Sequence, residues 1–186
     1  MFVIIHGSHR HGYHWEISTM LKNCLIANNV DVEIIDLAKS DIKYCCGHQY
    51  CQDKDCIYKD EFTTKHKDLL LNADGIYIVC PTYFNMPSGK LKTFMDRTNA
   101  LLPIIGVTKK TPLFGAWVSG EANADSIKCN MNLLIDYAEI MGWKTIKDLN
   151  IITRLENTRT LDESKIRNIA DNICKNLLDW RYGNEQ

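Results

Sequence analysis

The segment after the first apolar run of the chain combines residue types that bind phosphate. It reads His6-Gly-Ser-His-Arg-His-Gly-Tyr-His-Trp15 and leads directly into a helical pattern. The first turn of a helix offers unpaired N–H groups and the positive end of the helix dipole. Ser8 adds a hydroxyl donor and Arg10 a planar cation, so the loop is suited to a phosphomonoester. The alternative for Gly-Ser-x-Arg alone is a solvated polar turn that needs glycine for its geometry.

Cysteines form the second group with possible chemistry. Four of the eight, Cys45, Cys46, Cys51 and Cys56, fall within twelve residues. The chain has the size and apparent compartment of an intracellular enzyme, in which disulfides rarely persist, so metal binding or redox chemistry is the more relevant question for this group. The other four lie in apolar strand or helix patterns, and we expect them to be core residues. They are Cys24, Cys80, Cys129 and Cys174.

A third motif follows another apolar run. It reads Pro81-Thr-Tyr-Phe-Asn-Met-Pro-Ser-Gly89 and continues into Lys90-Leu-Lys-Thr-Phe-Met-Asp-Arg97. With Gly-Ser-x-Arg and the cysteine segment, this motif resembles the NADPH-dependent FMN reductases and the related iron-sulfur flavoproteins, whose pattern includes P-x-Y-F/W and S-G-x-L-K-x-F-x-D-R. The resemblance covers residues 1 to 120 approximately.

The resemblance implies that the first loop holds the FMN phosphate and that the second wraps the isoalloxazine ring. A third contact is expected after the fourth strand, by position alone. The expected cofactor-binding residues are Ser8, Arg10, His11, Gly12, Tyr13, His14, Trp15, Pro81, Thr82, Tyr83, Phe84, Asn85, Met86, Ser119 and Gly120. Without the family, Tyr83 and Phe84 could be core aromatics, and we interpret Asp96 with Arg97 as a surface or buried ion pair that has a structural role.

The chain departs from the family directly after Arg10. Relatives usually carry small Asn, Ser or Thr residues there, whereas this chain has Tyr13, His14 and Trp15. Backbone amides would then contribute more to phosphate binding. Alternatively, His14 donates to the phosphate and Trp15 covers the ribityl chain, or Trp15 is a core residue of the first helix.

The cysteine segment resembles the iron-sulfur flavoprotein motif C-x-x-C-x-x-C followed by a fourth cysteine. In that register the ligand set is Cys45, His48, Cys51 and Cys56, with Cys46 as an extra thiol. Histidine replaces cysteine in some iron-sulfur centres, so a [4Fe-4S] cluster is one alternative. Zinc on three sulfurs and His48 is the second. Metal-free thiols are the third, and the altered motif favours them slightly.

The elements that would position these residues alternate between strand and helix patterns. Expected strands are 2–5, 30–35, 76–80, 113–118 and 145–151, and helical faces recur over 17–25, 131–138 and 166–177. Thr160 and Glu163 form a possible capping box before the last helix. Such alternation favours an α/β, doubly wound parallel sheet with helices on both faces. The resemblance implies a flavodoxin-like, five-stranded sheet of order 2-1-3-4-5, in a single domain over 1–186 with a Cys-rich insertion at about 42–60.

Composition excludes several classes of function. The net charge of -1 and pI near 6.6 provide no broad positive field for nucleic acid. The longest apolar stretches are far below the roughly 20 residues that cross a bilayer, and nothing resembles a signal peptide, so we expect a cytoplasmic protein without membrane contact. The chain lacks G-x-G-x-x-G, the ATP P-loop and the hydrolase motifs G-x-S-x-G and H-E-x-x-H.

The resulting hypothesis is an FMN-dependent NAD(P)H oxidoreductase. Hydride passes from a nicotinamide nucleotide to the flavin, and electrons then pass to an unidentified small-molecule or protein acceptor. The cofactor performs the chemistry, so no catalytic side chain is assigned. The alternatives are a non-enzymatic electron carrier, either a flavodoxin or an iron-sulfur flavoprotein, and a flavin-free binding domain. The resemblance also implies a homo-oligomer, either dimer or tetramer.

Overall fold

A computed structural model describes residues 1–48, 51, 56–105, 111–121, 123–155 and 162–183. Its centre is a five-stranded sheet of order β2-β1-β3-β4-β5 in which every neighbouring pair is parallel. The strands are β1 (Phe2–His6), β2 (Val32–Asp36), β3 (Gly75–Pro81), β4 (Leu113–Gly120) and β5 (Lys144–Arg154). The predicted fold class and strand order are therefore confirmed, and the expected strand boundaries differ by at most three residues.

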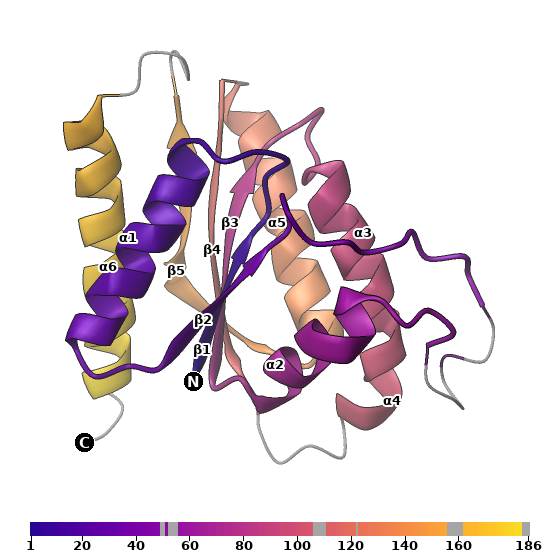
Figure 1. Ribbon diagram of the computed structural model, residues 1–186. Coiled ribbons are helices and arrows are strands. Elements are labelled where there is room, and N and C mark those ends of the chain that lie inside the picture. The colour runs from indigo at the N-terminus through magenta and orange to yellow at the C-terminus, as the bar shows by residue number, and fades with distance from the viewer. Residues whose placement is uncertain (49–50, 52–55, 106–110, 122, 156–161, 184–186) are drawn as a thin grey trace.

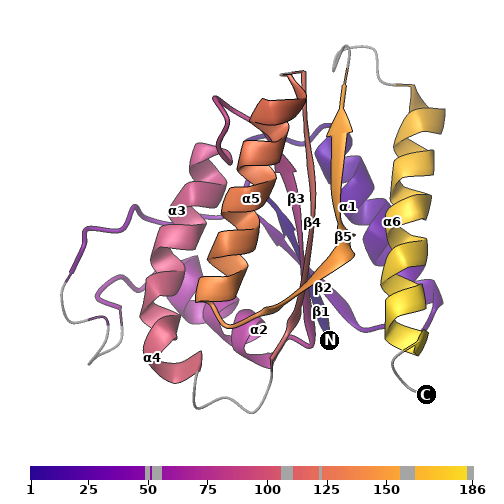
Figure 2. The ribbon, with the colours of Figure 1, turned by 180° about the vertical axis from the view of Figure 1, so that it is seen from behind.

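Helices cover both faces of the sheet (Figures 1 and 2). One face carries α1 (Tyr13–Ala27) and α6 (Glu163–Gly183). The other carries α3 (Gly89–Arg97) and α5 (Ala124–Ile140), with the shorter α2 (Lys67–Asn72) and α4 (Leu102–Ile105) at one end. A π-helical turn (Phe62–His66) precedes α2, and a 3-10 turn (Thr98–Leu101) precedes α4. The sequence patterns did not predict the helical segment from Phe62 to Asn72.

The side chains of β1 show why helices are needed on both faces. Successive strand residues point to opposite sides of a sheet. Val3 and Ile5 join the core under α3 and α5, whereas Phe2 and Ile4 join the core under α1 and α6. All five residues of β1 are buried, as expected for a central strand of a parallel sheet.

The expectation for the scattered cysteines is partly wrong. Cys80 is buried in β3, as predicted, but Cys129 is exposed on α5. Cys24 and Cys174 form a disulfide that joins α1 to α6, with their Cα atoms 6.6 Å apart. The two cysteines face each other because α1 and α6 lie side by side on one face of the sheet (Figure 1). The predicted cap residue Thr160 lies outside the described residues, whereas Glu163 is the first residue of α6.

An irregularity between β4 and β5 depends on a glycine. Phe114 pairs with Thr145, but Ala116 pairs with Asn150, so β5 carries extra residues between these positions. Leu149, in this extra segment, is buried against Gly115, and a Cβ atom on Gly115 would lie 2.5 Å from the Leu149 Cβ and 3.0 Å from the Tyr77 ring. The close approach of two rigid neighbours therefore requires glycine.

We predict that Gly115→Ala lowers the free energy of unfolding by about 1–3 kcal/mol, the usual cost of overpacking a dense core. Urea unfolding of the two proteins measures the difference. Gly12→Asn is the control, because a Cβ on Gly12 meets nothing within 4 Å and asparagine is favoured at this position, the N-cap of α1. Equal stability of Gly115→Ala and wild type would contradict the packing argument.

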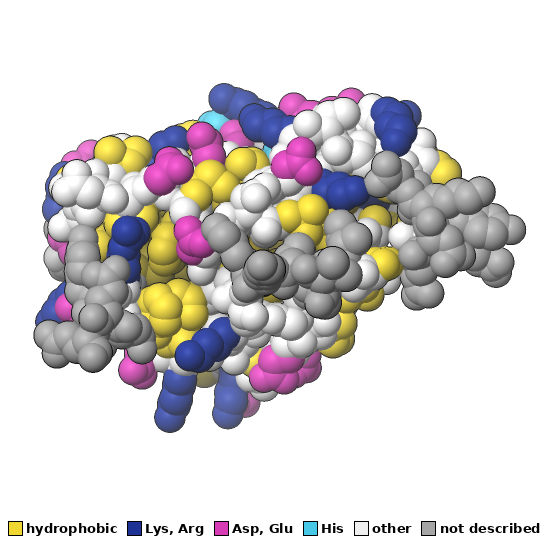
Figure 3. All heavy atoms as spheres, turned by 90° about the horizontal axis from the view of Figure 1, so that it is seen from below, with side chains coloured by type: hydrophobic (Ala, Val, Ile, Leu, Met, Phe, Trp, Pro, Cys, Tyr) yellow, Lys and Arg dark blue, Asp and Glu magenta, His cyan; other side chains and the backbone are white. Residues whose placement is uncertain are grey.

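The face at the amino ends of the strands has a mixed character. Figure 3 shows acidic and basic side chains interspersed with hydrophobic ones over this face. No field of a single sign is visible there, in agreement with the near-neutral net charge. Within the described part of the chain, no helix has the length and the apolar run that a bilayer crossing requires.

Candidate cofactor-binding site

The two predicted loops meet at the carboxyl ends of β1 and β3. The Ser88 hydroxyl donates to the Gly7 carbonyl at 2.5 Å and also caps α3, since its oxygen accepts from the Leu91 N–H at 3.1 Å. The Gly7 N–H donates to the Val79 carbonyl at 2.9 Å. Ser88 therefore fixes the first loop against the start of α3, and both loops open on the same edge of the sheet.

A cleft of about 550 Å³ lies at this edge, a volume within the usual range for small-molecule and cofactor sites. The loops after β1, β3 and β4 all contribute to it, as expected for ligand sites of open parallel sheets. Its lining includes the predicted residues Arg10, Gly12, Tyr13, His14, Pro81, Thr82, Tyr83, Ser119 and Gly120. It also includes Glu16, Glu121, Glu163 and Ile166, which the sequence analysis missed.

The start of α1 has the properties of an anion site. Gly12 is the N-cap residue and provides no side-chain oxygen to the free amides of the first turn. Arg10 is exposed and lines the cleft beside this turn. Ser8 is buried, and its hydroxyl oxygen lies 3.5 Å from the Arg10 N–H. Three glutamates also line the cleft, and one of them, Glu16, lies in the first turn of α1, so the groups that can attract an anion are the guanidinium of Arg10 and the free amides at the start of α1.

Tyr13 and His14 converge on Ser119 at the end of β4. The His14 Nε2 lies 3.0 Å from the Ser119 Oγ, and Ser119 also acts on the Tyr13 hydroxyl, whose pKa it lowers slightly against the effect of burial. Burial lowers the pKa of His14 to about 3, with smaller contributions from His6 and Arg10, so its ring is neutral. Burial likewise raises the pKa of Tyr13 to about 12. The His14 Nε2 is therefore hydrogen-bonded to Ser119 and is not available to donate to a phosphate in this arrangement.

We predict a pH-dependent loss of stability from His14. Its folded pKa lies below the unfolded value, so its contribution is present above pH 6.5 and is lost as pH falls toward 3. Between pH 6.5 and 5.5 this one group costs about 1 kcal/mol of unfolding free energy. Urea unfolding measures the free energy of unfolding of wild type and His14→Gln at both pH values. The loss between pH 6.5 and 5.5 should be larger in wild type by that amount. Parallel pH dependence of the two proteins would contradict the assignment.

The loop after β3 makes a tight reverse turn. Tyr83 and Met86 exchange two backbone hydrogen bonds of 2.9 Å, and Phe84 and Asn85 adopt φ values of 49° and 65°. This is the geometry of a type I′ turn. Phe84 is 98% exposed, so the alternative of a core aromatic is wrong for this residue. The turn projects Tyr83, Phe84 and Met86 outward at the cleft edge.

Several predicted residues lie beside the cleft without lining it. His11 bonds to Asp36, with the His11 Nε2 2.7 Å from the Asp36 Oδ2. Trp15 stacks flat on the His11 ring at a centroid distance of 4.2 Å. Ser8, His11, Trp15, Phe84, Asn85 and Met86 are the predicted residues absent from the cleft lining. The missed acids could have been suspected at Glu121, which directly follows Ser119 and Gly120, and at Glu163, at the start of the last helix.

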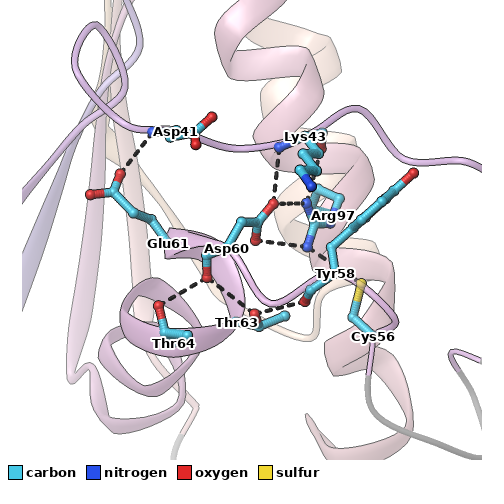
Figure 4. A network of polar contacts seen from close by, with 9 residues as sticks. All are labelled: Asp41, Lys43, Cys56, Tyr58, Asp60, Glu61, Thr63, Thr64 and Arg97. Carbon is cyan, nitrogen blue, oxygen red and sulfur yellow. Dashed lines mark hydrogen bonds and ion pairs between the residues drawn. The ribbon is translucent and has the colours of Figure 1, made fainter.

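The cysteine segment is anchored to α3 by a buried arginine (Figure 4). Arg97 makes a two-pronged contact with Asp60, with N–O distances of 2.6 and 3.0 Å, and donates to the Lys43 carbonyl at 2.9 Å. Its Nη2 also lies 3.3 Å from the Cys56 Sγ. Burial opposes ionisation of Asp60, but the hydrogen bonds from Arg97 and from the Lys43 N–H lower its pKa. Asp96 instead pairs with Lys92 on the exposed side of α3.

The four clustered thiols lie close enough to influence one another. Burial raises the pKa of Cys51, and the neighbouring Cys56, Cys45 and Cys46 raise it further. Tyr58 forms a hydrogen bond with Cys46, which raises the Tyr58 pKa. Cys46, treated as an extra thiol in the sequence, therefore belongs to this group.

The thiol group does not have the spacing of a zinc site. Sulfur ligands of a tetrahedral zinc ion lie about 3.8 Å apart. Among the described residues, which include all four thiols and His48, the one group of three or more ligand atoms within 4.8 Å of one another is His6, His11 and Asp36. The predicted set Cys45, His48, Cys51 and Cys56 is therefore looser than a preformed tetrahedral site.

Comparison with known protein families tests the family resemblance that the sequences of these loops suggested. A family model described as NADPH-dependent FMN reductase matches residues 1–154. The chain belongs to this family. The match covers the loops after β1, β3 and β4 and the whole cysteine segment, so all the lining residues of the cleft except those of α6 fall within it.

Curated relatives of this FMN reductase family member include an iron-sulfur flavoprotein of Methanocaldococcus jannaschii, 35% identical over 101 residues. The aligned segment is 53% of this chain and 50% of the relative, so the chain matches about half the length of that protein. A second, the iron-sulfur flavoprotein of Archaeoglobus fulgidus, is 38% identical over 68 residues, which are 37% of this chain and 33% of the relative.

Among solved structures, RosB with bound 8-demethyl-8-formylriboflavin-5'-phosphate superposes with a TM-score of 0.70 at 13% identity, covering 94% of this chain and 77% of that one. At such identity the likeness establishes the flavodoxin-like fold, which this family member shares.

Proposed function

We propose that the chain is an FMN-dependent oxidoreductase that accepts hydride from a nicotinamide nucleotide. The observation that carries the proposal is the convergence of three strand-end loops on one cleft, with an uncapped helix start and Arg10 at one end. Amide donors and a guanidinium suit a phosphate, while the aromatic Tyr83 at the other loop suits a flat ring. The membership in the FMN reductase family supports the same cofactor.

The residues present fit FMN in a specific way. The phosphate would be held by the amides at the start of α1 and by Arg10, since the His14 Nε2 is already bonded to Ser119. The ring would lie against Pro81, Thr82 and Gly120, which line the cleft. When bound, FMN would supply the hydride-accepting centre, and the protein would bind, orient and shield it.

The Ser119 network would hold the shape of the cleft floor. His14 is neutral and Tyr13 is protonated over the physiological pH range, so neither side chain changes charge there. Asn130 adds a further restraint, because its Nδ2 donates to the Thr82 Oγ1 at 3.1 Å and to the Pro81 carbonyl at 3.3 Å. The flavin would therefore meet a rigid floor made from the ends of β3 and β4.

The thiol group favours a second candidate, an iron-sulfur flavoprotein that carries electrons without being an enzyme. Cys45, Cys46, Cys51 and Cys56 gather in one segment, and the Arg97 N–H near Cys56 would stabilise a thiolate at that position. Thiolates are the usual ligands of [4Fe-4S] clusters. The names of the archaeal relatives agree with this candidate. The acceptor of the electrons in either function is a small molecule or a protein of unidentified class.

The exposed turn after β3 supports a homo-oligomer. Tyr83, Phe84 and Met86 form a protruding apolar group at the cleft edge. A second copy of the chain covering this group would bury apolar area and close the cleft over the flavin ring. Light scattering of wild type and Phe84→Ser measures whether the assembly depends on this turn.

Anaerobic reduction tests the proposed function. The purified protein is loaded with FMN, and its visible flavin spectrum is followed after addition of NADH or NADPH. We expect the visible absorption of the flavin to be lost at a rate fast enough for catalytic turnover. Bleaching only by a reduced partner protein would select the carrier, and failure to retain any flavin would contradict both functions. Iron and sulfide analysis of the same sample tests the cluster separately.

A further inference from the structure

We infer that His6, His11 and Asp36 form a binding site for a divalent transition-metal ion such as Zn²⁺ or Co²⁺. One ring nitrogen of each histidine and a carboxylate oxygen of Asp36 all lie within 4.8 Å of one another. Two imidazoles and one carboxylate form a donor set that suits borderline divalent ions. The site is separate from the cysteine segment and does not depend on the proposed flavin chemistry.

The topology builds two of the three ligands into the sheet. His6 and Asp36 are the last residues of β1 and β2, and they are direct partners in the parallel register. Paired residues of adjacent strands point to the same face, so these side chains share one side of the sheet edge. His11 comes from the loop between β1 and α1, and its Nε2 lies 2.7 Å from the Asp36 Oδ2.

His6 offers a lone pair that no described group uses. The ring is fully buried, and its Nδ1 has no hydrogen-bond partner among the described residues. Its Nε2 lies 3.3 Å from the Arg10 carbonyl, which can only accept, so that nitrogen carries the proton. The Nδ1 is therefore the unprotonated nitrogen. A buried acceptor without a partner is costly, and a metal ion would satisfy it.

Neighbouring groups hold the other two ligands in place. Trp15 stacks on the His11 ring with an interplanar angle of 7°. The Ala38 N–H donates to the second carboxylate oxygen of Asp36 at 3.2 Å. Supporting contacts of this kind orient the ligands of metal sites in general. His11 and Asp36 keep 30% and 17% of their side-chain surface exposed, so an ion and a water ligand can reach the site.

An ion here would act on the cofactor loop. It would join β1, β2 and the loop that carries Arg10 and Gly12 to the cleft. The site would therefore fix the position of the phosphate-binding amides without touching the flavin ring.

Cobalt titration of the full chain tests the inference. The protein is stripped with a chelator, its thiols are kept reduced, and visible Co²⁺ bands are recorded. Cysteine ligands add a sulfur-to-cobalt charge-transfer band, which nitrogen and oxygen ligands lack, so the two regions of the protein are distinguished. We expect bands without the sulfur signature, and at least about 100-fold weaker binding in His11→Ala and Asp36→Asn, since loss of even a supporting contact costs 10–100-fold.

His9→Ala is the matched control, because His9 is an exposed histidine of the same loop outside the group. Binding in this variant should equal that of wild type. A second readout needs no variant: histidine-ring NMR with Zn²⁺ should shift His6 and His11 and leave His66 unchanged. Cobalt bands that always carry the sulfur signature, unchanged binding in His11→Ala, or unshifted His6 and His11 resonances would overturn the inference.

Discussion

Replacing Arg97 with alanine is expected to lower the free energy of unfolding by about 3–5 kcal/mol, the usual cost of breaking a buried ion pair from one side. The Arg97 and Asp60 side chains keep only 1% and 4% of their surface exposed. Figure 4 shows that Arg97 supplies the two charged hydrogen bonds of the Asp60 carboxylate, so without Arg97 this buried carboxylate would keep only backbone donors such as the Lys43 N–H. The melting temperature should fall by roughly 6–20 °C.

The exposed pair on the same helix provides the control for Arg97. Asp96→Ala removes a surface pair with Lys92, and such pairs contribute about 0–1 kcal/mol. The loss of unfolding free energy in Arg97→Lys should lie between those of Arg97→Ala and Asp96→Ala, because lysine keeps the charge but lacks the planar guanidinium. Thermal unfolding of the three variants measures the order. A loss below about 1 kcal/mol in Arg97→Ala would contradict the buried ion pair.

The Arg97 variants also test how the cysteine segment is held. Arg97 links α3 to Lys43, Cys56 and Asp60, which flank the segment on both sides. Reaction of the thiols with a chromogenic disulfide reagent should be faster in Arg97→Ala than in wild type. Asp96→Ala should react at the wild-type rate, since Asp96 pairs with Lys92 on the exposed side of α3.

Replacing Gly12 with aspartate should weaken FMN binding by at least about 100-fold. The new carboxylate would occupy the N-cap of α1 and accept its free amides, where the phosphate is proposed to bind. Two like charges about 4 Å apart at a protein surface repel each other by about 4 kcal/mol. The backbone has room for the side chain, because a Cβ on Gly12 meets no atom within 4 Å.

Gly12→Asn is the matched control for this substitution, since it has the same size and capping ability without the charge. We expect its FMN affinity to stay within about 10-fold of wild type, and we expect neither variant to lose stability, because Asp and Asn are both preferred at N-caps. Flavin fluorescence quenching measures both affinities. Equal FMN affinity of the aspartate and asparagine variants would place the phosphate elsewhere.

Local patterns in the sequence were sufficient to predict the strands of the sheet and the loops at their carboxyl ends. Strand periodicity and the loops at strand ends depend on neighbouring residues, so β1, β3 and β4 and their loops could be predicted closely. The positions of Arg10, Gly12, Tyr83 and Ser119 at one cleft follow from the general behaviour of parallel sheets.

Partners far apart in the chain could not be predicted. The expected ion pair between Asp96 and Arg97 is wrong: Arg97 pairs with Asp60 and Asp96 pairs with Lys92, because Asp60, 37 residues before Arg97, packs against α3. The His11–Asp36 contact and the Cys24–Cys174 disulfide likewise join residues from different elements. The segment from Phe62 to Asn72 was missed because it begins with a π-helical turn, which blurs the helical period.

The central claim is that the cleft recognises a phosphorylated flavin through the start of α1. Titration of the flavin-free protein with FMN and with riboflavin tests this claim most directly, because the two ligands differ only in the phosphate. The account predicts that FMN binds at least about 100-fold more tightly than riboflavin, a difference typical of hydrogen bonds to a charged group. Equal affinity for the two ligands, or no binding of either, would contradict it.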